Sequence, residues 1–374
     1  MTVYLDNAST TKPCKESAEA VMLALTENYG NPSSLHKMGL NAQLAVDSAR
    51  KSIATALGCE AECIYFTSGA TESNNLAIRG AVSAHGRRNK KIIVSAVEHA
   101  SVSETMDSLE NQGYEVVRIS PKNGVFDAGD FVREADENTC LISMMLVNNE
   151  TGHILPVKEV FSAVKRRFPH IITHCDCVQG FMKLLVKASS LGADLISLSG
   201  HKIHAVKGVG ALYIKKGVRI NPIISGGKQE KGIRSGTESV PLIAGFGSAV
   251  EKLASTIAQR YERAYELKAF LLDKLSGIEE VTVNSPADGS PYIINISMQR
   301  RSEIMLHYLE QNGIYVSSGS ACSKGAQSGV LAQFGVNQKD SDSALRVSIG
   351  CETTEAELEF FVEKLKEGIE NIRT

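Results

Sequence analysis

The sequence lacks an excess of either charge. Its 374 residues include 40 Lys and Arg against 42 Asp and Glu, which gives a formal net charge of −2. Proteins that bind nucleic acid or acidic lipid carry a surplus of positive charge that pairs with phosphates. We therefore expect neither nucleic acid nor a membrane among the partners of this chain.

Long hydrophobic runs are also missing. The chain opens on Met-Thr-Val-Tyr-Leu-Asp-Asn, without the basic stretch and apolar stretch of a secretory signal. Elsewhere the apolar runs stop well short of the roughly 20 residues that cross a bilayer. These absences predict a cytoplasmic protein. Hydrophobic residues still make up 43% of the chain, so we expect a globular fold with a sizeable core.

Cysteine is too scarce to form a disulfide scaffold. The chain has eight cysteines and no Cys-x-x-Cys pair. We expect most of them to be reduced, and we interpret four as small buried hydrophobic residues: Cys63, Cys140, Cys175 and Cys177. No metal site is predicted.

Short β-branched runs alternate with longer amphipathic stretches between Ile64 and Tyr213. This alternation is typical of an α/β fold with a mostly parallel sheet and crossover helices. The predicted strands are Ile64–Thr67, Ile92–Ala96, Val116–Ile119, Cys140–Val147, Ile171–Asp176, Asp194–Ser199 and Gly210–Lys215. Parallel sheets bind ligands at the carboxyl ends of their strands, so the residues that follow these strands are the candidates for function.

The pattern changes in the last third of the chain. A long helical stretch covers residues 244–274, and shorter strand signals return at 280–283 and 292–298. Thr354 and Glu357 form a capping-box pattern ahead of a final amphipathic helix. We predict a large domain of residues 15–255 and a smaller domain of residues 1–14 and 256–374.

Polar residues follow several of the predicted strands. Lys202 comes directly after the strand that ends at Ser199, where its amine could form a Schiff base with the aldehyde of pyridoxal phosphate. Asp176 ends another strand, where its carboxylate could pair with a ring nitrogen. Each residue alone is more simply interpreted as a solvated lysine or a helix-capping aspartate.

The segment from Ser68 to Ser73 follows a strand and opens a helix. Its hydroxyls and backbone N–H groups suit a phosphate. It matches neither the ATP-binding loop nor the dinucleotide fingerprint. His99 could stack on a ring and Asn149 could donate to a phenolate oxygen, although each could also be structural. Five strands that deliver such groups to one edge favour a pyridoxal phosphate site.

Cys322 lies in a segment rich in Ser and Gly, from Ser317 to Gly325. Such a composition favours an exposed loop over a core, and an exposed thiol is able to react. The alternative for Cys322 is a small buried side chain, which the loop argues against.

These motifs give the chain a family resemblance over nearly its whole length. It resembles the fold-type I pyridoxal phosphate enzymes of the class V aminotransferase group, and most closely the cysteine desulfurases of the NifS/IscS type. The segments that carry the resemblance are Tyr4–Thr11, Gly30–Ser34 with His36, Phe66–Asn75, Glu98–His99, Val147–Glu150, Asp176 with Gln179, Ser199–Lys202, Arg234–Thr237, Ser317–Cys322 and Arg346–Ser348.

The resemblance implies a large domain with a seven-stranded sheet, a smaller α+β domain and a homodimer. It implies that Lys202 bonds the cofactor, Asp176 pairs with the pyridine nitrogen, and His99 stacks on the ring. Gln179 and Asn149 would contact the phenolic oxygen. Asn31 and Arg346 would clamp the substrate carboxylate. The phosphate would be held by Ala70, Thr71, Ser199 and His201, and by Thr237 reaching the other subunit.

The implied reaction converts L-cysteine to L-alanine. Lys202 would act as the general base, and Cys322 would take the sulfur as a persulfide and pass it to a protein acceptor, for iron–sulfur cluster assembly or for tRNA or cofactor thiolation. The alternatives are a selenocysteine lyase, another class V aminotransferase, and a non-catalytic sulfur carrier or redox scaffold. Three places depart from the family pattern: Ala205-Val206 after the lysine, the cysteines that flank Asp176, and the loop after Cys322, which is shorter than in some relatives.

Overall fold

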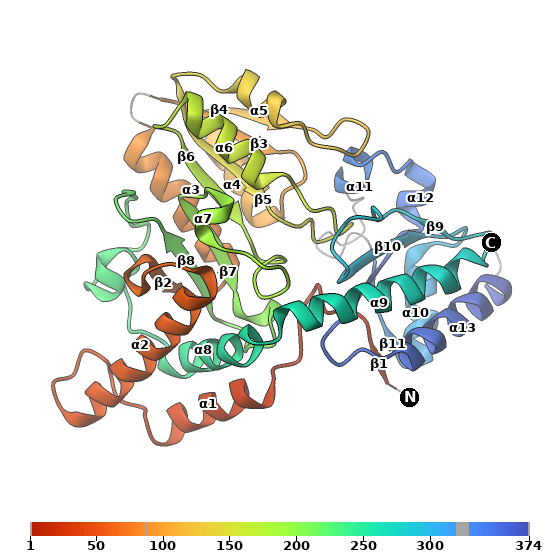
Figure 1. The fold of residues 1–374 in the computed structure, drawn as a ribbon, viewed down its shortest axis with the longest axis horizontal. Helices are drawn as coiled ribbons and strands as arrows, with labels where there is room; N and C mark the ends of the chain where they lie inside the picture. Colours follow the sequence, from red (N-terminus) through yellow and green to blue (C-terminus); the bar gives the residue numbers. More distant parts are fainter. Residues whose placement is uncertain (1, 87–88, 319–328, 373–374) are drawn as a thin grey trace.

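A seven-stranded sheet is the centre of the larger part of the molecule (Figure 1). The computed structural model describes residues 2–86, 89–318 and 329–372. The strand order is β2-β8-β7-β6-β5-β3-β4, and β8 alone runs antiparallel to its neighbours. The strands are β2 (Ile64–Thr67), β3 (Lys91–Ser95), β4 (Glu115–Ile119), β5 (Thr139–Met145), β6 (Ile172–Asp176), β7 (Leu195–Ser199) and β8 (Gly210–Ile214).

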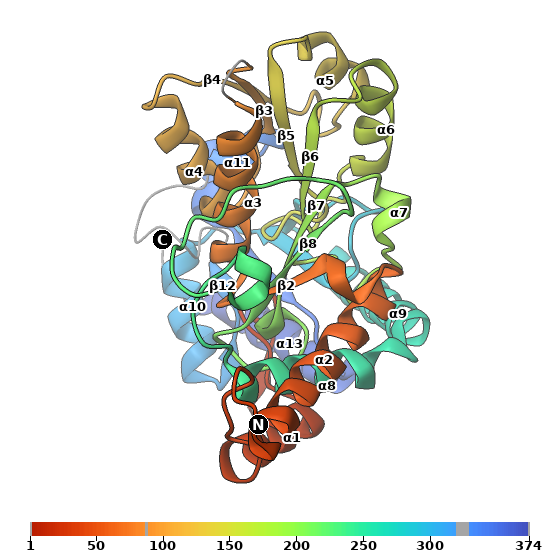
Figure 2. The same cartoon turned by 90° about the vertical axis from the view of Figure 1, so that its left-hand side faces the viewer.

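Helices cover both faces of this sheet. Figure 2 shows α3 and α4 on one side and α6 and α7 on the other. Ile92 and Val94 of β3 pack in one buried cluster, whereas Ile93 between them packs in another, as alternating side chains require. The helices of this part are α1 (Lys15–Thr26), α2 (Lys37–Leu57), α3 (Ala70–His85), α4 (Ala100–Glu110), α5 (Ala128–Glu134), α6 (Val157–Arg167), α7 (Ala188–Leu191) and α8 (Val240–Ala254).

A second, smaller sheet has its own core. It is antiparallel with the order β12-β13-β10-β9, and beside it β1 pairs with β11. The strands are β1 (Val3–Tyr4), β9 (Thr282–Val283), β10 (Ile293–Ser297), β11 (Ile314–Tyr315), β12 (Ser317–Ser318) and β13 (Leu345–Ser348). The helices are α9 (Ile257–Ser276), α10 (Ser302–Gln311), α11 (Gly329–Gln333), α12 (Gln338–Asp342) and α13 (Glu355–Asn371).

The long helix α9 joins the two parts (Figure 1). Near its start Ala264 packs in the core of the large sheet, and further along Leu267 and Leu271 pack in the core of the small one. The residues of the second core all fall within the predicted small domain. The domain boundaries themselves stay a prediction.

The α/β class and all seven strands of the large sheet are confirmed, each within two residues of its predicted bounds. The single helix predicted over residues 244–274 is wrong, because the structure breaks it into α8 and α9 at Ser255 and Thr256. The Thr256 hydroxyl donates to Leu253 O and accepts from Arg260 Nε. Side-chain bonds of this kind compete with the helical ladder and favour an interruption.

The capping box ahead of the last helix is confirmed. Thr354 Oγ1 accepts from Glu357 N, and the Glu357 carboxylate accepts from Thr354 N. The apolar face that follows packs into the second core through Leu358, Phe361 and Leu365. In the described ranges, no helix combines the length and the apolarity needed to cross a membrane.

Candidate active site

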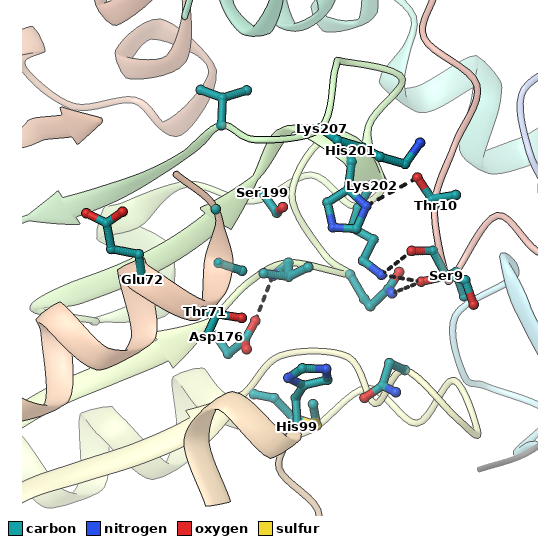
Figure 3. A pocket seen from close by; sticks show the side chains of 18 of the residues that line it. Ser9, Thr10, Thr71, Glu72, His99, Asp176, Ser199, His201, Lys202 and Lys207 are labelled. Atoms are coloured by element: carbon teal, nitrogen blue, oxygen red, sulfur yellow. Dashed lines mark hydrogen bonds between the residues drawn. The ribbon is translucent and has the colours of Figure 1, made fainter. Parts of the chain in front are cut away.

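The predicted polar residues meet in one cavity at the carboxyl ends of the parallel strands. The cavity has a volume of about 590 Å³ and is shown in Figure 3. Ten of the predicted residues line it: Ala70, Thr71, His99, Asn149, Asp176, Gln179, Ser199, His201, Lys202 and Arg346.

Lys202 lies at the end of a single 3₁₀ turn, Gly200–Lys202, that directly follows β7. Its Nζ donates to Ala8 O at 2.7 Å and to Ser9 O at 2.6 Å. The N-terminal segment therefore lies beside Lys202 and holds its amine at the cavity, as Figure 3 shows. Two carbonyl acceptors and a partly buried setting keep the amine in one place within reach of a ligand.

Asp176 is the last residue of β6 and is 5% exposed. Its Oδ1 accepts from Val178 N at 3.0 Å, and its Oδ2 accepts from Asn74 Nδ2 at 2.8 Å. Asn74 is fully buried on α3 and was not among the predicted site residues. It lies inside the recognised segment Phe66–Asn75, so a polar residue on the buried face of that helix was the available signal.

His99 caps the start of α4. Its Nδ1 accepts from Ser101 N at 3.1 Å, which leaves the proton of a neutral ring on Nε2. Burial lowers the pKa of the imidazole, and the positive charges of Lys202 and Arg346 lower it further against the effect of Asp176. A neutral ring beside the cavity is suited to stack on a flat cofactor. Figure 3 shows it across the cavity from Lys202.

The start of α3 offers a cradle for an anion. Ala70 and Thr71 begin this 16-residue helix, and both line the cavity together with Ser199. The Ser199 hydroxyl is buried and has no hydrogen-bond partner among the residues that the structure describes. A polar atom left unpaired at a helix N-terminus fits a phosphate oxygen. This orphaned hydroxyl is the observation in favour of a phosphorylated cofactor.

Close packing of two glycines shapes the same cradle. A Cβ on Gly210 of β8 would lie 2.7 Å from Gly69 Cα, just before α3 begins. Gly69 itself has φ 156°, a backbone conformation that L side chains rarely adopt. With glycine at both positions, β8 can pack directly against the turn that precedes α3.

His201 lies on the same side as Lys202. Burial lowers the pKa of the His201 imidazole to about 4, and the charges of Lys202 and Lys207 add to the effect. The ring is therefore neutral near pH 7, with Nδ1 at 3.3 Å from Thr10 Oγ1. A neutral imidazole can still donate one hydrogen bond to a phosphate.

Gln179 lines the cavity with both ends of its amide engaged. Its Nε2 donates to Ala8 O at 2.8 Å, and its Oε1 accepts from Lys183 Nζ at 2.7 Å. Burial lowers the pKa of the Lys183 ammonium to about 7, and Lys202 adds to the shift. Lys183 was not predicted. Its spacing of four residues after Gln179 was the signal that the two side chains meet.

Arg346 on β13 enters the cavity from the smaller sheet and is 3% exposed. Its Nη1 donates to Asn149 O at 3.0 Å and its Nη2 to Asp6 Oδ1 at 3.1 Å. Among the described residues, its buried Nε has no hydrogen-bond partner. The guanidinium is thus fixed in place by its two terminal nitrogens, with the Nε–H left over.

Two predicted residues lie away from this cavity. Asn31 is exposed in the segment between α1 and α2, where its side chain accepts from Ser33 N. Thr237 lines a neighbouring cavity of about 230 Å³ together with Ser68. An ion pair between Arg234 and Glu72 ties the segment of Thr237 to the start of α3.

Glu98, next to His99, was quoted in the resemblance but given no role. The side chain is 6% exposed and accepts from Ser95 Oγ and from Met145 N. Burial raises the pKa of this carboxyl to about 8, and the nearby Asp176 contributes. Its Oε2 has no partner. A protonated carboxyl thus links the ends of β3 and β5 behind the cavity.

Cys322 lies outside the described residues. The four cysteines predicted to be buried hydrophobic residues are buried and free. Two of them, Cys175 and Cys177, flank Asp176 and pack in the core of the large sheet.

Comparison with known proteins points to one family. The model of the aminotransferase class-V family matches residues 3–361. A protein named cysteine desulfurase IscS from Methanosarcina thermophila is 38% identical, covering 99% of this chain and 93% of the relative. Another protein named cysteine desulfurase IscS, from Dictyoglomus turgidum, is 39% identical, covering 100% of this chain and 95% of the relative.

Solved structures agree with this finding. One described as a NifS-like protein has a TM-score of 0.94 and 34% identity and covers 100% of both chains. A structure of SspA in complex with cysteine has a TM-score of 0.83 and 30% identity and covers 94% of this chain and 100% of the other.

Proposed function

This chain belongs to the aminotransferase class-V family, within which it is a cysteine desulfurase, and we propose that its cavity beside Lys202 holds pyridoxal 5'-phosphate and L-cysteine. Members of this family depend on pyridoxal phosphate. The observation that carries the proposal is the meeting of Lys202, Asp176 and the orphaned Ser199 hydroxyl in one cavity.

Each part of the cofactor has a matching group in the cavity. The phosphate would be held by the α3 N-terminus with Ser199 and His201, the ring by His99, and the ring nitrogen by Asp176. When bound, the cofactor supplies an electron sink for the bond to the substrate α-carbon. Asn74 keeps the Asp176 carboxylate aimed at the cavity, because it donates to Oδ2.

Lys202 moves the proton in this scheme. Its Nζ would hold the cofactor through a Schiff base, and the free amine would accept the α-proton of the substrate. Ala8 O and Ser9 O give the displaced amine two acceptors that hold it beside the cavity. The fixed amine is thereby positioned as a general base.

Arg346 would bind the substrate carboxylate through its unpaired Nε. Asn149 lines the cavity beside it, since its backbone carbonyl accepts from Arg346 Nη1. We therefore propose Asn149 as the neighbour of Arg346 at the carboxylate. Asn31 would serve there only from another subunit, because it lies outside this cavity.

Cys322 would take the sulfur. In this step its thiolate attacks the substrate sulfur, an S–S bond forms and the C–S bond breaks, and the carbon skeleton leaves as L-alanine. The persulfide on Cys322 then passes to a protein acceptor, for iron–sulfur cluster assembly or thiolation. A cytoplasmic location stays the prediction from sequence.

We also propose a homodimer. A group of large apolar side chains is exposed on α1, α2 and the segment between them, and such a patch on a folded protein marks an interaction surface. Its members are Met22, Leu23, Leu25, Tyr29, Leu35, Leu40 and Leu44. The segment also carries Asn31, so a second copy docked there would bring Asn31 near another subunit.

The test compares the purified wild-type protein, Lys202→Ala and Cys322→Ala. Wild type should show the absorbance of the cofactor's Schiff base and should release alanine and, with reductant, sulfide from L-cysteine. Lys202→Ala should lose the Schiff-base absorbance, whereas Cys322→Ala should keep it and release neither product.

Other outcomes distinguish the alternatives. Product release unchanged in Cys322→Ala would indicate another pyridoxal phosphate enzyme, either a plain aminotransferase or a selenocysteine lyase, and the second would give more alanine from selenocysteine. The absence of any cofactor absorbance in the wild type would favour a non-catalytic sulfur carrier or redox scaffold.

A further inference from the structure

A second cavity lies on the other side of Lys202. Its volume is about 10 Å³, enough for about one water molecule. It is lined by Cys351, which follows β13, and by His204, Arg260, Tyr292 and Lys183. None of the roles assigned above uses the thiol of Cys351.

His204 is held beside this thiol in a strained conformation. Its φ of 58° lies in the left-handed region, which few residues other than glycine adopt. The strain is maintained by Thr11 Oγ1, which accepts from His204 N at 2.7 Å, and by Cys14 N, which donates to His204 O at 2.8 Å. Strain of this kind persists where the surroundings over-determine the backbone, and it is concentrated at functional sites.

The tautomer of His204 suits a base. Its Nδ1 lies 3.0 Å from Lys12 O, an acceptor, so the ring proton is on Nδ1 and the free lone pair is on Nε2. His204 and Cys351 both line the cavity. Burial raises the pKa of the Cys351 thiol, but His204 and Arg260 outweigh burial and hold it below its ordinary value. Cys351 and His204 thus resemble a nucleophile and its base.

Arg260 supplies a fixed positive charge. Its Nη1 lies 3.9 Å from Cys351 Sγ, while its Nε donates to Thr256 Oγ1 at 3.1 Å and its Nη2 to Leu253 O at 3.0 Å. Three bonds from one guanidinium leave it little freedom to turn away. A cation in this place stabilises a thiolate.

Tyr292 gives a second, independent sign of a ligand. The residue is 4% exposed, and within the described part of the chain its buried hydroxyl has no hydrogen-bond partner. Buried hydroxyls are nearly always paired, so an unpaired one in the wall of a cavity of this size indicates an oxygen atom that the cavity is built to take.

We propose that Cys351 is a second reactive thiol, which a peroxide oxidises to a sulfenic acid with the help of His204 and Arg260. The thiol gives its proton to His204 and the thiolate sulfur attacks one peroxide oxygen. An S–O bond forms and the O–O bond breaks, the sulfur is oxidised by two electrons, and the departing hydroxide recovers the proton as water. The new oxygen occupies the cavity, where it accepts from Tyr292 Oη and Arg260.

Access and location support this assignment. Cys351 is an exposed residue whose thiol is partly buried beside the cavity. Neither His204 nor Cys351 is among the residues proposed for desulfuration, although Lys202 lines both cavities. The proposal therefore stands whether or not Cys322 has its proposed role.

The test treats the purified holoenzyme with hydrogen peroxide and traps sulfenic acid with dimedone, followed by peptide mass spectrometry. Cys59 is the matched internal control, because it is partly exposed and burial raises its pKa to about 12. The Cys351 peptide should carry at least about ten times the label of the Cys59 peptide. Equal labelling of the two would overturn the proposal.

Two variants test the parts of the site. His204→Asn tolerates the left-handed backbone and removes the base, so labelling at Cys351 should fall about ten-fold while the Cys322 peptide is unchanged. Tyr292→Phe should lower the yield of trapped sulfenic acid at Cys351 but not its alkylation by iodoacetamide. Unchanged labelling in His204→Asn would show that His204 does not act as the base. An unchanged yield in Tyr292→Phe would show that the Tyr292 hydroxyl does not bind the sulfenic oxygen. Cofactor absorbance and circular dichroism check that each variant is folded.

Discussion

At the scale of single residues, the site depends on side chains that hold other side chains. Asn74 links Asp176 to Ser101, which contacts His99, so one amide supports two of the proposed cofactor contacts. Lys183 fixes the amide of Gln179 in the same way. These positioning residues contact the cofactor only through others, and their effects should be visible in cofactor binding.

Asn74→Ala should weaken the binding of pyridoxal phosphate. The change removes a buried hydrogen bond to a carboxylate, which is worth about 1.5–3 kcal/mol, so the dissociation constant should rise at least about ten-fold. An absorbance titration of the apoprotein measures it. Asn111→Ala, in the turn after α4, is the control and should bind as wild type does. Equal binding by Asn74→Ala would show that Asp176 needs no support.

Glu98→Gln should change how stability depends on pH. The folded protein keeps the Glu98 proton up to about pH 8, whereas the ordinary value of 4.5 applies to the unfolded chain. The wild-type free energy of unfolding therefore falls as pH rises between these values, and glutamine removes the effect. Denaturant titrations measure the free energy of unfolding of both proteins. The difference, variant minus wild type, should increase by at least about 1 kcal/mol as the pH is raised from about 5 to about 8. A constant difference would mean that Glu98 is ionised in the folded protein.

At the scale of elements, the phosphate cradle depends on how β8 meets the start of α3. Gly210→Ala places a methyl group 2.7 Å from Gly69 Cα, which must displace the turn. The dissociation constant of pyridoxal phosphate should rise by at least about ten-fold, and that of pyridoxal, which has no phosphate, should rise less. Gly277→Ala is the control, because a Cβ there meets nothing within 4 Å. Equal losses for both ligands would indicate general misfolding of the site.

The last helix, α13, contributes to the stability of the small sheet and not to cofactor binding. Thr354→Ala removes one half of the capping box of α13 and should lower the free energy of unfolding by about 1 kcal/mol. Thr354→Ser keeps the hydroxyl, so its free energy of unfolding should be close to that of the wild type. Since α13 packs in the core of the small sheet, cofactor affinity should stay at the wild-type value in both. A loss of affinity would show that the two cores are coupled.

At the scale of the whole molecule, the proposed dimer makes one site depend on two chains. Thr237 lies in the cavity beside the one that holds Lys202. If Thr237 serves the partner, a mixed dimer of Lys202→Ala and Thr237→Ala chains contains one intact site. Random mixing should then recover about a quarter of the wild-type activity from two impaired parents, measured as alanine release. No recovery would place Thr237 in the site of its own chain.

Local pattern was enough to predict the large sheet and most of the cavity. Strands buried on both faces are continuously apolar, which made them recognisable in the sequence. Because the carboxyl ends of parallel strands meet at one edge, Lys202, Asp176 and His99 could be placed together from the sequence alone. The break at Thr256 was missed because the apolar helical pattern continues on both sides of it, although Ser255 and Thr256 are weak helix formers whose hydroxyls compete with the helical ladder.

The sequence by itself determined the class of chemistry, because the residue types that bind a pyridoxal phosphate ring and phosphate follow the strands in chain order. Only the tertiary structure decided which residues support them and which lie elsewhere. Asn74 and Asp176 are 102 residues apart, and His204 meets Cys351 across the boundary between the two cores. Contacts of this kind depend on how separate elements pack, and periodicity along one element carries no information about its distant neighbours.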